Sequence, residues 1–284
     1  MSRIILVAET GADITAEQAR EKGIWLVPMH VSMGDKTLDD GTFPAEEICA
    51  YYDRTGTLPK TSGSSPDDFT KVFAEIHALY PDAHILHLAY SAVTTVSYQS
   101  AVIAAQGLDY VTSLDTRHLS AGQGLVVLAM ADRLAQDPDM TLEQAVACAE
   151  ELSDRARMCF MPRDLEYLRA GGRVSNAVAL GGKLLSLHPC IEVLGGRLLA
   201  KKKYRGRFES VVPQLIREYS DREKLDRSDV AFICSTGMSD SVRALAEQEA
   251  ARCGFKNVHW VKTGCVITAH GGPGCFGIAG FAQE

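Results

Sequence analysis

Residues 263–279 read TGCVITAHGGPGCFGIA, and this stretch places the strictest conditions on the fold. We expect an apolar strand at residues 265–267 that leads into His270, then a turn over residues 271–274 and a second apolar run at 276–279. Glycine permits positive φ and close backbone approach, and proline fixes its own φ, so the turn is sharply defined. His270 and nearby N–H groups such as that of Gly271 could meet an anionic group, or the histidine could merely cap a tight hairpin.

The composition is that of a soluble globular protein. The chain has 284 residues, 46% of them hydrophobic and 23% charged, which suits two modest domains. Its net charge of −7 gives no sign of nucleic acid or an anionic membrane as partner. No apolar run approaches the roughly 20 residues that span a bilayer, so we expect no integral membrane segment. Residues 4–8 are too short for a signal peptide, and the eight scattered cysteines suit a reducing compartment, so we expect a cytoplasmic protein.

The first half of the chain alternates short apolar runs with helical patterns, which is typical of a doubly wound α/β domain. We expect strands at residues 3–8, 24–28, 29–33, 85–89 and 110–114, and helices at residues 15–22, 43–54, 66–79, 98–105, 122–134 and 141–158. We therefore place the first domain at residues 1–158.

The second half predicts another α/β domain, residues 159–284. Gly195 and Gly196 signal a hairpin between strands at residues 190–194 and 197–200. Further strands are expected at 229–234 and 258–262, and helices at 208–219 and 240–253. The basic run at 201–207, which includes Arg205, is the kind of segment that usually forms a solvated face.

Two hydroxyl-rich loops precede helices. The first contains Thr61 and Ser62, and the second runs from Ser91 through Thr95. Capping explains one serine before a helix, but four hydroxyls between residues 61 and 65 exceed what a cap requires. Ligands of open α/β sheets bind where such loops gather. Neutral hydroxyls with one histidine suit a single carboxylate or acyl head group, whose tail an apolar interdomain cleft would receive.

The sequence lacks the motifs that several other kinds of binding or catalytic site require. There is no GxGxxG after a strand and no GxxxxGK[ST], so we expect no nucleotide cofactor. A metal site is poorly supported, because His84 and His87 would face opposite sides of a strand. HGGPG at residues 270–274 is similar to the oxyanion-hole motif of certain α/β-hydrolase peptidases, but the GxSxG that follows it there is absent.

A Ser/His-dependent acyl hydrolase or acyltransferase is the alternative reading of the same residues. In it, His270 would act with Thr61, Ser62 or Ser91.

Short motifs along residues 3–280 share one family pattern. They are AETGAD at 8–13, KTS at 60–62 with Pro66, the segment from Ser91 to YQSA at 98–101, Asp115-Thr116 with Gly122 and Gly124, DLEYL at 164–168 with GGRVS at 171–175, and His270 with GPG at 272–274. Together they resemble the DegV family, bacterial fatty-acid-binding proteins that serve as acyl carriers for fatty acid kinase. The DLEYL and GGRVS block is the most specific part of the likeness.

The resemblance implies a two-domain α/β protein that holds a long-chain fatty acid in a tunnel, with the carboxylate at the domain junction. Thr61, Ser62 and His270 would donate to the carboxylate, together with Ser91 or Thr95 of the second loop. In that loop Ala92 stands where the family has a serine, so which hydroxyl donates stays open.

The same resemblance implies a kinase partner. Arg205 lies in a segment that reaches the carboxylate in some relatives, and Arg173 would lie on the face that meets the kinase. The carrier would not be a catalyst: the kinase would phosphorylate the bound acid to an acyl phosphate. Glu9 and Gly11 replace an aspartate and a threonine of the family's first motif, and Val93 and Val96 replace glycines of the second loop.

Overall fold

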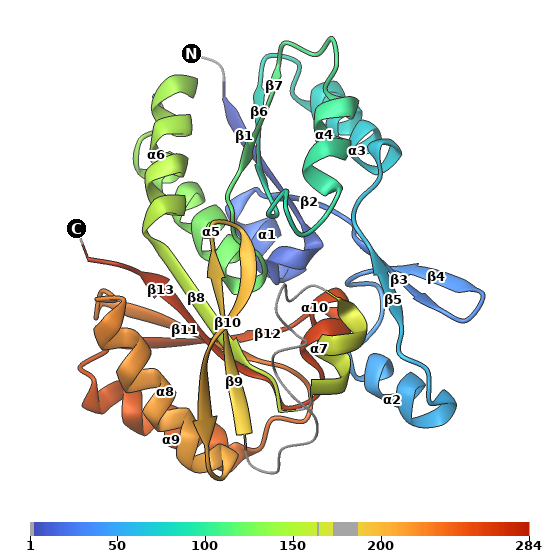
Figure 1. The fold of residues 1–284 in the computed structure, drawn as a ribbon. Helices are drawn as coiled ribbons and strands as arrows, with labels where there is room; N and C mark the ends of the chain where they lie inside the picture. Colours follow the sequence, from blue (N-terminus) through green and yellow to red (C-terminus); the bar gives the residue numbers. More distant parts are fainter. Residues whose placement is uncertain (1–2, 164, 173–186, 284) are drawn as a thin grey trace.

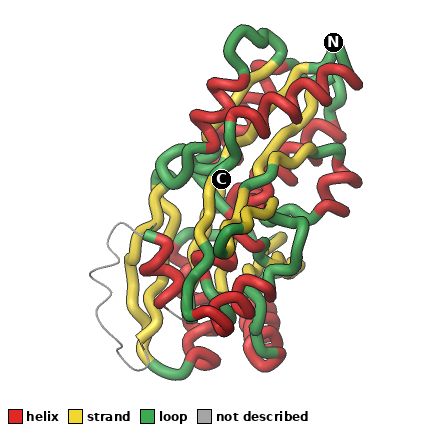
Figure 2. Tube along the Cα trace, turned by 90° about the vertical axis from the view of Figure 1, so that its right-hand side faces the viewer, coloured by secondary structure: helices red, strands yellow, loops and turns green. Residues whose placement is uncertain are grey.

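The computed structural model describes residues 3–163, 165–172 and 187–283, which form a mixed α/β fold. Within these residues the strands make a four-stranded, a six-stranded and a three-stranded sheet. Figure 1 shows the four-stranded sheet above the six-stranded one, with the three-stranded sheet at the side. Figure 2, seen at right angles to that view, shows that the molecule is elongated along the same direction.

The four-stranded sheet is parallel throughout, in the order β2-β1-β6-β7. Its strands are β1 (Ile4–Glu9), β2 (Trp25–Val27), β6 (His84–Ala89) and β7 (Val111–Asp115). The surrounding helices are the short 3₁₀ turn η1 (Thr10–Ala12), α1 (Ala16–Lys22), α3 (Pro66–Leu79), α4 (Ser97–Ala104), α5 (Ser120–Gln136) and α6 (Leu142–Arg155). Both faces are covered because successive strand residues point to opposite sides: Val7 packs with α3, and Leu6 with α5 and α6.

The three-stranded sheet is antiparallel, in the order β4-β3-β5. It consists of β3 (His30–Met33), β4 (Lys36–Asp39) and β5 (Lys60–Ser62), and the helix α2 (Glu46–Thr55) connects β4 to β5. The prediction that residues 60–62 form a loop was wrong. Thr61 and Ser62 pair with Val31 and His30, so an extended backbone, not a free loop, presents their hydroxyls.

The six-stranded sheet has the order β10-β9-β8-β13-β11-β12 and is antiparallel except between β11 and β12. Its strands are β8 (Ala156–Met161), β9 (Leu187–Leu194), β10 (Arg197–Arg205), β11 (Asp229–Cys234), β12 (Asn257–Lys262) and β13 (Phe276–Phe281). The remaining helices are α7 (Leu165–Gly171), α8 (Phe208–Arg222), α9 (Asp240–Arg252) and α10 (Cys265–Gly271). Gly195 and Gly196, both at positive φ, turn β9 into β10 and confirm the predicted hairpin.

Two further predictions were wrong. Residues 265–267 begin the helix α10 rather than a strand, because carboxylates far away in the sequence accept hydrogen bonds from its first N–H groups. The helix expected at 141–158 ends at Arg155, and Met158 lies in β8. In β8, Cys159 and Met161 pack toward α8, whereas Met158 and Phe160 face the opposite side, so the strand is buried on both faces.

One hydrophobic cluster joins the upper and lower regions. It contains Tyr90 and Leu119 beyond the four-stranded sheet, Met158 and Ile233 on the six-stranded sheet, and Val266 of α10. The division at residue 158 stays a prediction; β8 spans that residue and belongs wholly to the six-stranded sheet. Across the described ranges, no helix combines the length and apolarity that crossing a membrane requires.

Candidate functional site

A cavity opens inside the cluster that joins the two regions. The atom-free space in and around it is about 830 Å³, which includes its opening to solvent. Its wall is formed by Met29, Thr61, Ser62, Gly63, Tyr90, Thr94, Thr95, Leu119, Ser120, Met158, Phe160, Leu168, Leu198, Ile233, Ser235, Thr263, Val266, Ile267, His270, Gly271 and Cys275. Most of these side chains are apolar, so the cavity suits a ligand that is largely hydrocarbon.

The polar part of the wall is centred on Thr61 and His270. Thr61 Oγ1 on β5 and His270 Nε2 on α10 form a 2.7 Å hydrogen bond across 209 positions of sequence. Gly171 at the end of α7 lies so close that a Cβ there would come within 2.2 Å of His270 Nδ1. The imidazole of His270 can occupy this position because residue 171 has no side chain.

The second hydroxyl loop closes against the first. A Cβ at Gly63 would lie 2.2 Å from Thr95 Oγ1 and 2.5 Å from Ser97 Oγ, so the two loops touch through a bare backbone. Ser97 Oγ accepts a 3.0 Å hydrogen bond from the Ser64 N–H, and it lies 3.1 Å from Thr95 Oγ1. Ser62 and Thr95 thus reach the same cavity wall as Thr61.

Comparison with known proteins supplies the family. A family model described as "Uncharacterised protein, DegV family" matches residues 3–283. The chain belongs to the DegV family. It is 30% identical to a DegV domain-containing protein of Streptomyces coelicolor over 281 residues, 98% of each chain. It is 26% identical to a protein of Thermotoga maritima named "Fatty acid-binding protein", over 97% of this chain and 96% of the other.

Solved structures agree with this assignment. A DegV family protein from Thermus thermophilus, whose structure is titled for fatty acid binding, superimposes with a TM-score of 0.88 at 30% identity. The match covers 99% of this chain and 100% of the other. The two-domain α/β fold expected from the DegV motifs is therefore confirmed.

The cavity wall includes several, but not all, of the site residues predicted from the sequence. Thr61, Ser62, Thr95, His270 and Gly271 line it. Ser91 does not belong to the described wall: it is fully buried, and its hydroxyl donates to the Gly196 carbonyl at 2.8 Å, so it anchors the β9–β10 hairpin.

The two arginines differ in what the structure says of them. Arg205 is exposed at the end of β10 and also does not belong to the described wall. Arg173 lies outside the described residues.

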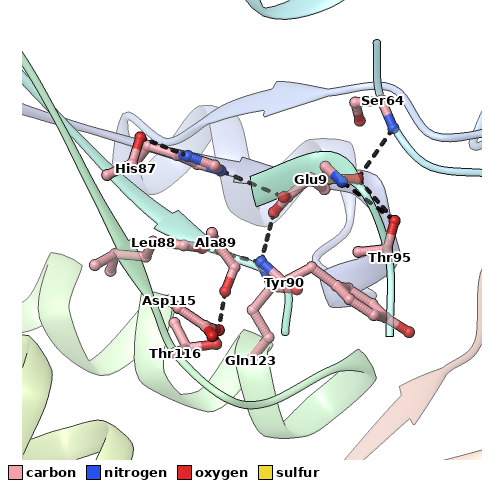
Figure 3. Close-up of polar contacts among 12 residues, drawn as sticks. Glu9, Ser64, His87, Leu88, Ala89, Tyr90, Thr95, Asp115, Thr116 and Gln123 are labelled. Atoms are coloured by element: carbon pink, nitrogen blue, oxygen red, sulfur yellow. Dashed lines mark hydrogen bonds and ion pairs between the residues drawn. The ribbon is translucent and has the colours of Figure 1, made fainter. Parts of the chain in front are cut away.

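The first motif of the DegV pattern contributes a buried carboxylate that pairs with a histidine and supports the cavity wall. Glu9 Oε1 lies 3.4 Å from His87 Nε2, and both side chains are fully buried. Glu9 Oε2 accepts hydrogen bonds from the Tyr90 N–H at 2.9 Å and from Gln123 Nε2 at 2.8 Å (Figure 3). Burial opposes ionisation of Glu9, but the attraction of His87 and these hydrogen bonds outweigh it and lower the pKa of Glu9. The carboxylate thereby fixes the backbone at Tyr90, a residue of the cavity wall.

Two more buried carboxylates hold the other end of α10. The Gly264 N–H donates to Asp13 Oδ1 at 2.7 Å, and the Cys265 N–H donates to Asp40 Oδ1 at 2.8 Å. Ser120, another wall residue, donates from Oγ to Asp13 Oδ2. Burial, with a smaller contribution from the charge of Asp40, raises the pKa of Asp13 to about 7, although those hydrogen bonds lower it.

Sequence reasoning missed Asp13, Asp40, Tyr90 and Ser120 as contributors to the site. Asp13 ends the AETGAD motif and was available as a signal, because the resemblance already marked that motif. Tyr90 directly follows the strand that leads into the second loop. Nothing in the sequence placed Asp40 beside Cys265, since that contact spans 225 positions.

Proposed function

We propose that this protein binds a long-chain fatty acid in the cavity and presents its carboxylate to a fatty acid kinase. The observation that carries the proposal is the hydrogen bond between Thr61 and His270 in the wall of a mostly apolar cavity. The Thermus thermophilus relative, similar over nearly its whole length and titled for fatty acid binding, supports the same ligand class. No cofactor is needed for this role.

The hydrocarbon tail supplies most of the binding free energy in this proposal. At ~0.8 kcal/mol per buried CH₂, a tail of roughly 15 methylenes offers on the order of 12 kcal/mol before the costs of association are subtracted. A head-group hydrogen bond adds about 1–3 kcal/mol. The apolar wall therefore sets affinity, while the polar end of the cavity sets the orientation of the acid.

The head group meets neutral donors rather than a cluster of cations. Thr61, Ser62, Thr95 and His270 can all donate from the wall, which also includes Gly271. Without such partners a buried carboxyl group would take up a proton and bind in its neutral form. We place the carboxylate here, at the junction of residues 1–158 and 159–284.

Presentation to the kinase is the second half of the proposal. The kinase phosphorylates the bound carboxylate, and the carrier, which has no catalytic activity of its own, then holds the acyl phosphate in the cytoplasm. Arg205, exposed on the edge strand β10, would reach toward the phosphorylated head group, and Arg173 would contact the kinase.

Native mass spectrometry of the protein as purified tests the ligand class. We expect a bound mass that matches long-chain fatty acids, lost on delipidation and restored by adding palmitic acid. A delipidated protein that takes up no fatty acid would contradict the proposal. Turnover of activated acyl esters without any kinase would instead support the hydrolase alternative, since Thr61 and His270 also stand at the distance of a nucleophile and its base.

A further inference from the structure

Met29 and Met158 both line the cavity, and each is backed by a glycine. A Cβ at Gly11 would lie 2.6 Å from Met29 Sδ and 3.0 Å from the Tyr90 ring. A Cβ at Gly122 would lie 3.1 Å from His118 Nδ1 and 3.2 Å from Met158 Sδ. Neither glycine has a positive φ, so what each one supplies is space and not a special backbone conformation.

We propose that Gly11, and to a smaller degree Gly122, set the width of the fatty-acid cavity. The space that these glycines leave free lets the side chains of Met29 and Met158 lie farther back from the cavity. The cavity would then accept acyl chains wider than a straight saturated one, such as chains with a cis double bond or a methyl branch. This inference rests on the proposed function and names the chain shapes that the same site admits.

The packing around Met29 explains why one added methyl group would narrow the cavity. Met29 is only 3% exposed and lies in the closely packed cluster between the two regions. A Cβ at Gly11, 2.6 Å from the sulfur, forces the thioether to move, and the same Cβ would also press on the Tyr90 ring at 3.0 Å. Met29 lines the cavity, which offers free space next to its side chain, so the displaced thioether moves into the cavity.

Methionine suits this arrangement because its side chain is unbranched and adapts to irregular space. At Gly122 the contacts of 3.1 and 3.2 Å are less severe, so His118 and Met158 need to move only by a few tenths of an ångström. The two positions therefore predict a graded response: a large effect at Gly11 and a small one at Gly122.

The test compares two C18 fatty acids, stearic acid and oleic acid, by titrating each into delipidated protein. For Gly11→Ala we expect oleic acid to bind at least about tenfold more weakly while stearic acid changes less than about threefold, since a single methylene in an apolar pocket discriminates by that order. Gly122→Ala should shift the preference in the same direction but less. Alanine also favours the helix α5 there, which guards against loss of folding.

A rescue variant separates narrowing of the cavity from general damage. Gly11→Ala combined with Met29→Ala should regain oleic acid binding, because removing the thioether returns the space. Gly280→Ala on β13 is the matched control, because its Cβ would meet nothing closer than 3.4 Å and Gly280 does not belong to the described cavity wall. Equal weakening for both acids, unchanged preference in both glycine variants, or failure of the rescue would overturn the inference alone. Wild-type protein that binds neither acid would overturn the proposed function, and this inference with it.

Discussion

Asp13 and Gly264 lie 251 positions apart, and the Gly264 N–H donates to Asp13 Oδ1 at 2.7 Å. Asp40 accepts from the next residue, Cys265, so two carboxylates of the N-terminal half hold the start of α10. The other end of that helix carries His270. The contacts of Asp13 and Asp40 at the start of α10 therefore help to determine the position of His270 at its other end.

The Asp13 contact predicts a pH dependence of stability. Because the pKa of Asp13 is about 7 in the folded protein and about 3.9 in the unfolded chain, the folded state binds more protons between these values. The contribution of Asp13 to the free energy of unfolding is therefore fully present below pH ~4 and is lost as the pH rises to about 7. Asp13→Asn removes this dependence, so urea denaturation should show the variant gaining stability relative to wild type from pH 4 to pH 7. A difference between the two proteins that stays constant over that range would contradict the assignment.

The buried pair of Glu9 and His87 predicts a large loss of stability on substitution. Glu9→Gln removes the charge from a fully buried pair, and breaking such pairs costs on the order of 3 kcal/mol. Urea denaturation at pH 7 measures the loss. Glu21→Gln at an exposed position of α1 is the control and should stay within about 0.5 kcal/mol of wild type. A loss at Glu9 as small as the control's would mean that the pair contributes little.

The close approach of Gly171 to His270 predicts a defect in head-group recognition. In Gly171→Ala the new Cβ would lie 2.2 Å from His270 Nδ1, so the imidazole must leave the position in which its Nε2 bonds Thr61. We expect the preference for a free fatty acid over its methyl ester to fall about tenfold, the low end of what one hydrogen bond to a charged group contributes. Gly280→Ala serves as the control, because its Cβ meets no atom closer than 3.4 Å. An unchanged preference in Gly171→Ala would show that the position of His270 does not matter for the head group.

His270 should matter more for presentation than for binding. The apolar wall supplies most of the affinity, so His270→Ala should retain most lipid occupancy while kinase-coupled phosphorylation of the bound acid falls. Both quantities are measured on the same delipidated and reloaded protein. Equal losses in the two would contradict this division of roles.

Arg173→Ala tests the partner surface implied by the GGRVS motif. We expect unchanged lipid occupancy and weaker binding to the kinase, measured by titrating the loaded carrier into the kinase. Loss of bound lipid in this variant would count against a role confined to the partner.

The sequence predicted the buried strands of the parallel sheet better than it predicted the conformation of short segments. The apolar run in β1 was sufficient to place a buried strand, whereas Thr61 was expected near His270 through the DegV resemblance, which assigns both to one carboxylate. Residues 265–267 were misassigned because a short apolar run fits a strand and a buried helix equally well. Asp13 and Asp40, which decide in favour of the helix, lie too far away in the sequence to be linked to it by pattern.

Ser91 shows a different limit. Its place in the motif suggested a head-group donor, but its hydroxyl donates to Gly196 on the β9–β10 hairpin. That hairpin was predicted, whereas its position against the second loop depends on how the two regions pack. A motif thus indicates which residue types gather, and tertiary contacts decide which of their hydroxyls line the cavity.

A crystal structure of the protein with a bound long-chain fatty acid tests the central claim most directly. We predict a carboxylate within about 3.2 Å of both Thr61 Oγ1 and His270 Nε2, with the tail extending along Met29 and Met158. A fatty acid whose carboxylate lies away from Thr61 and His270, or one bound outside this cavity, would contradict the account.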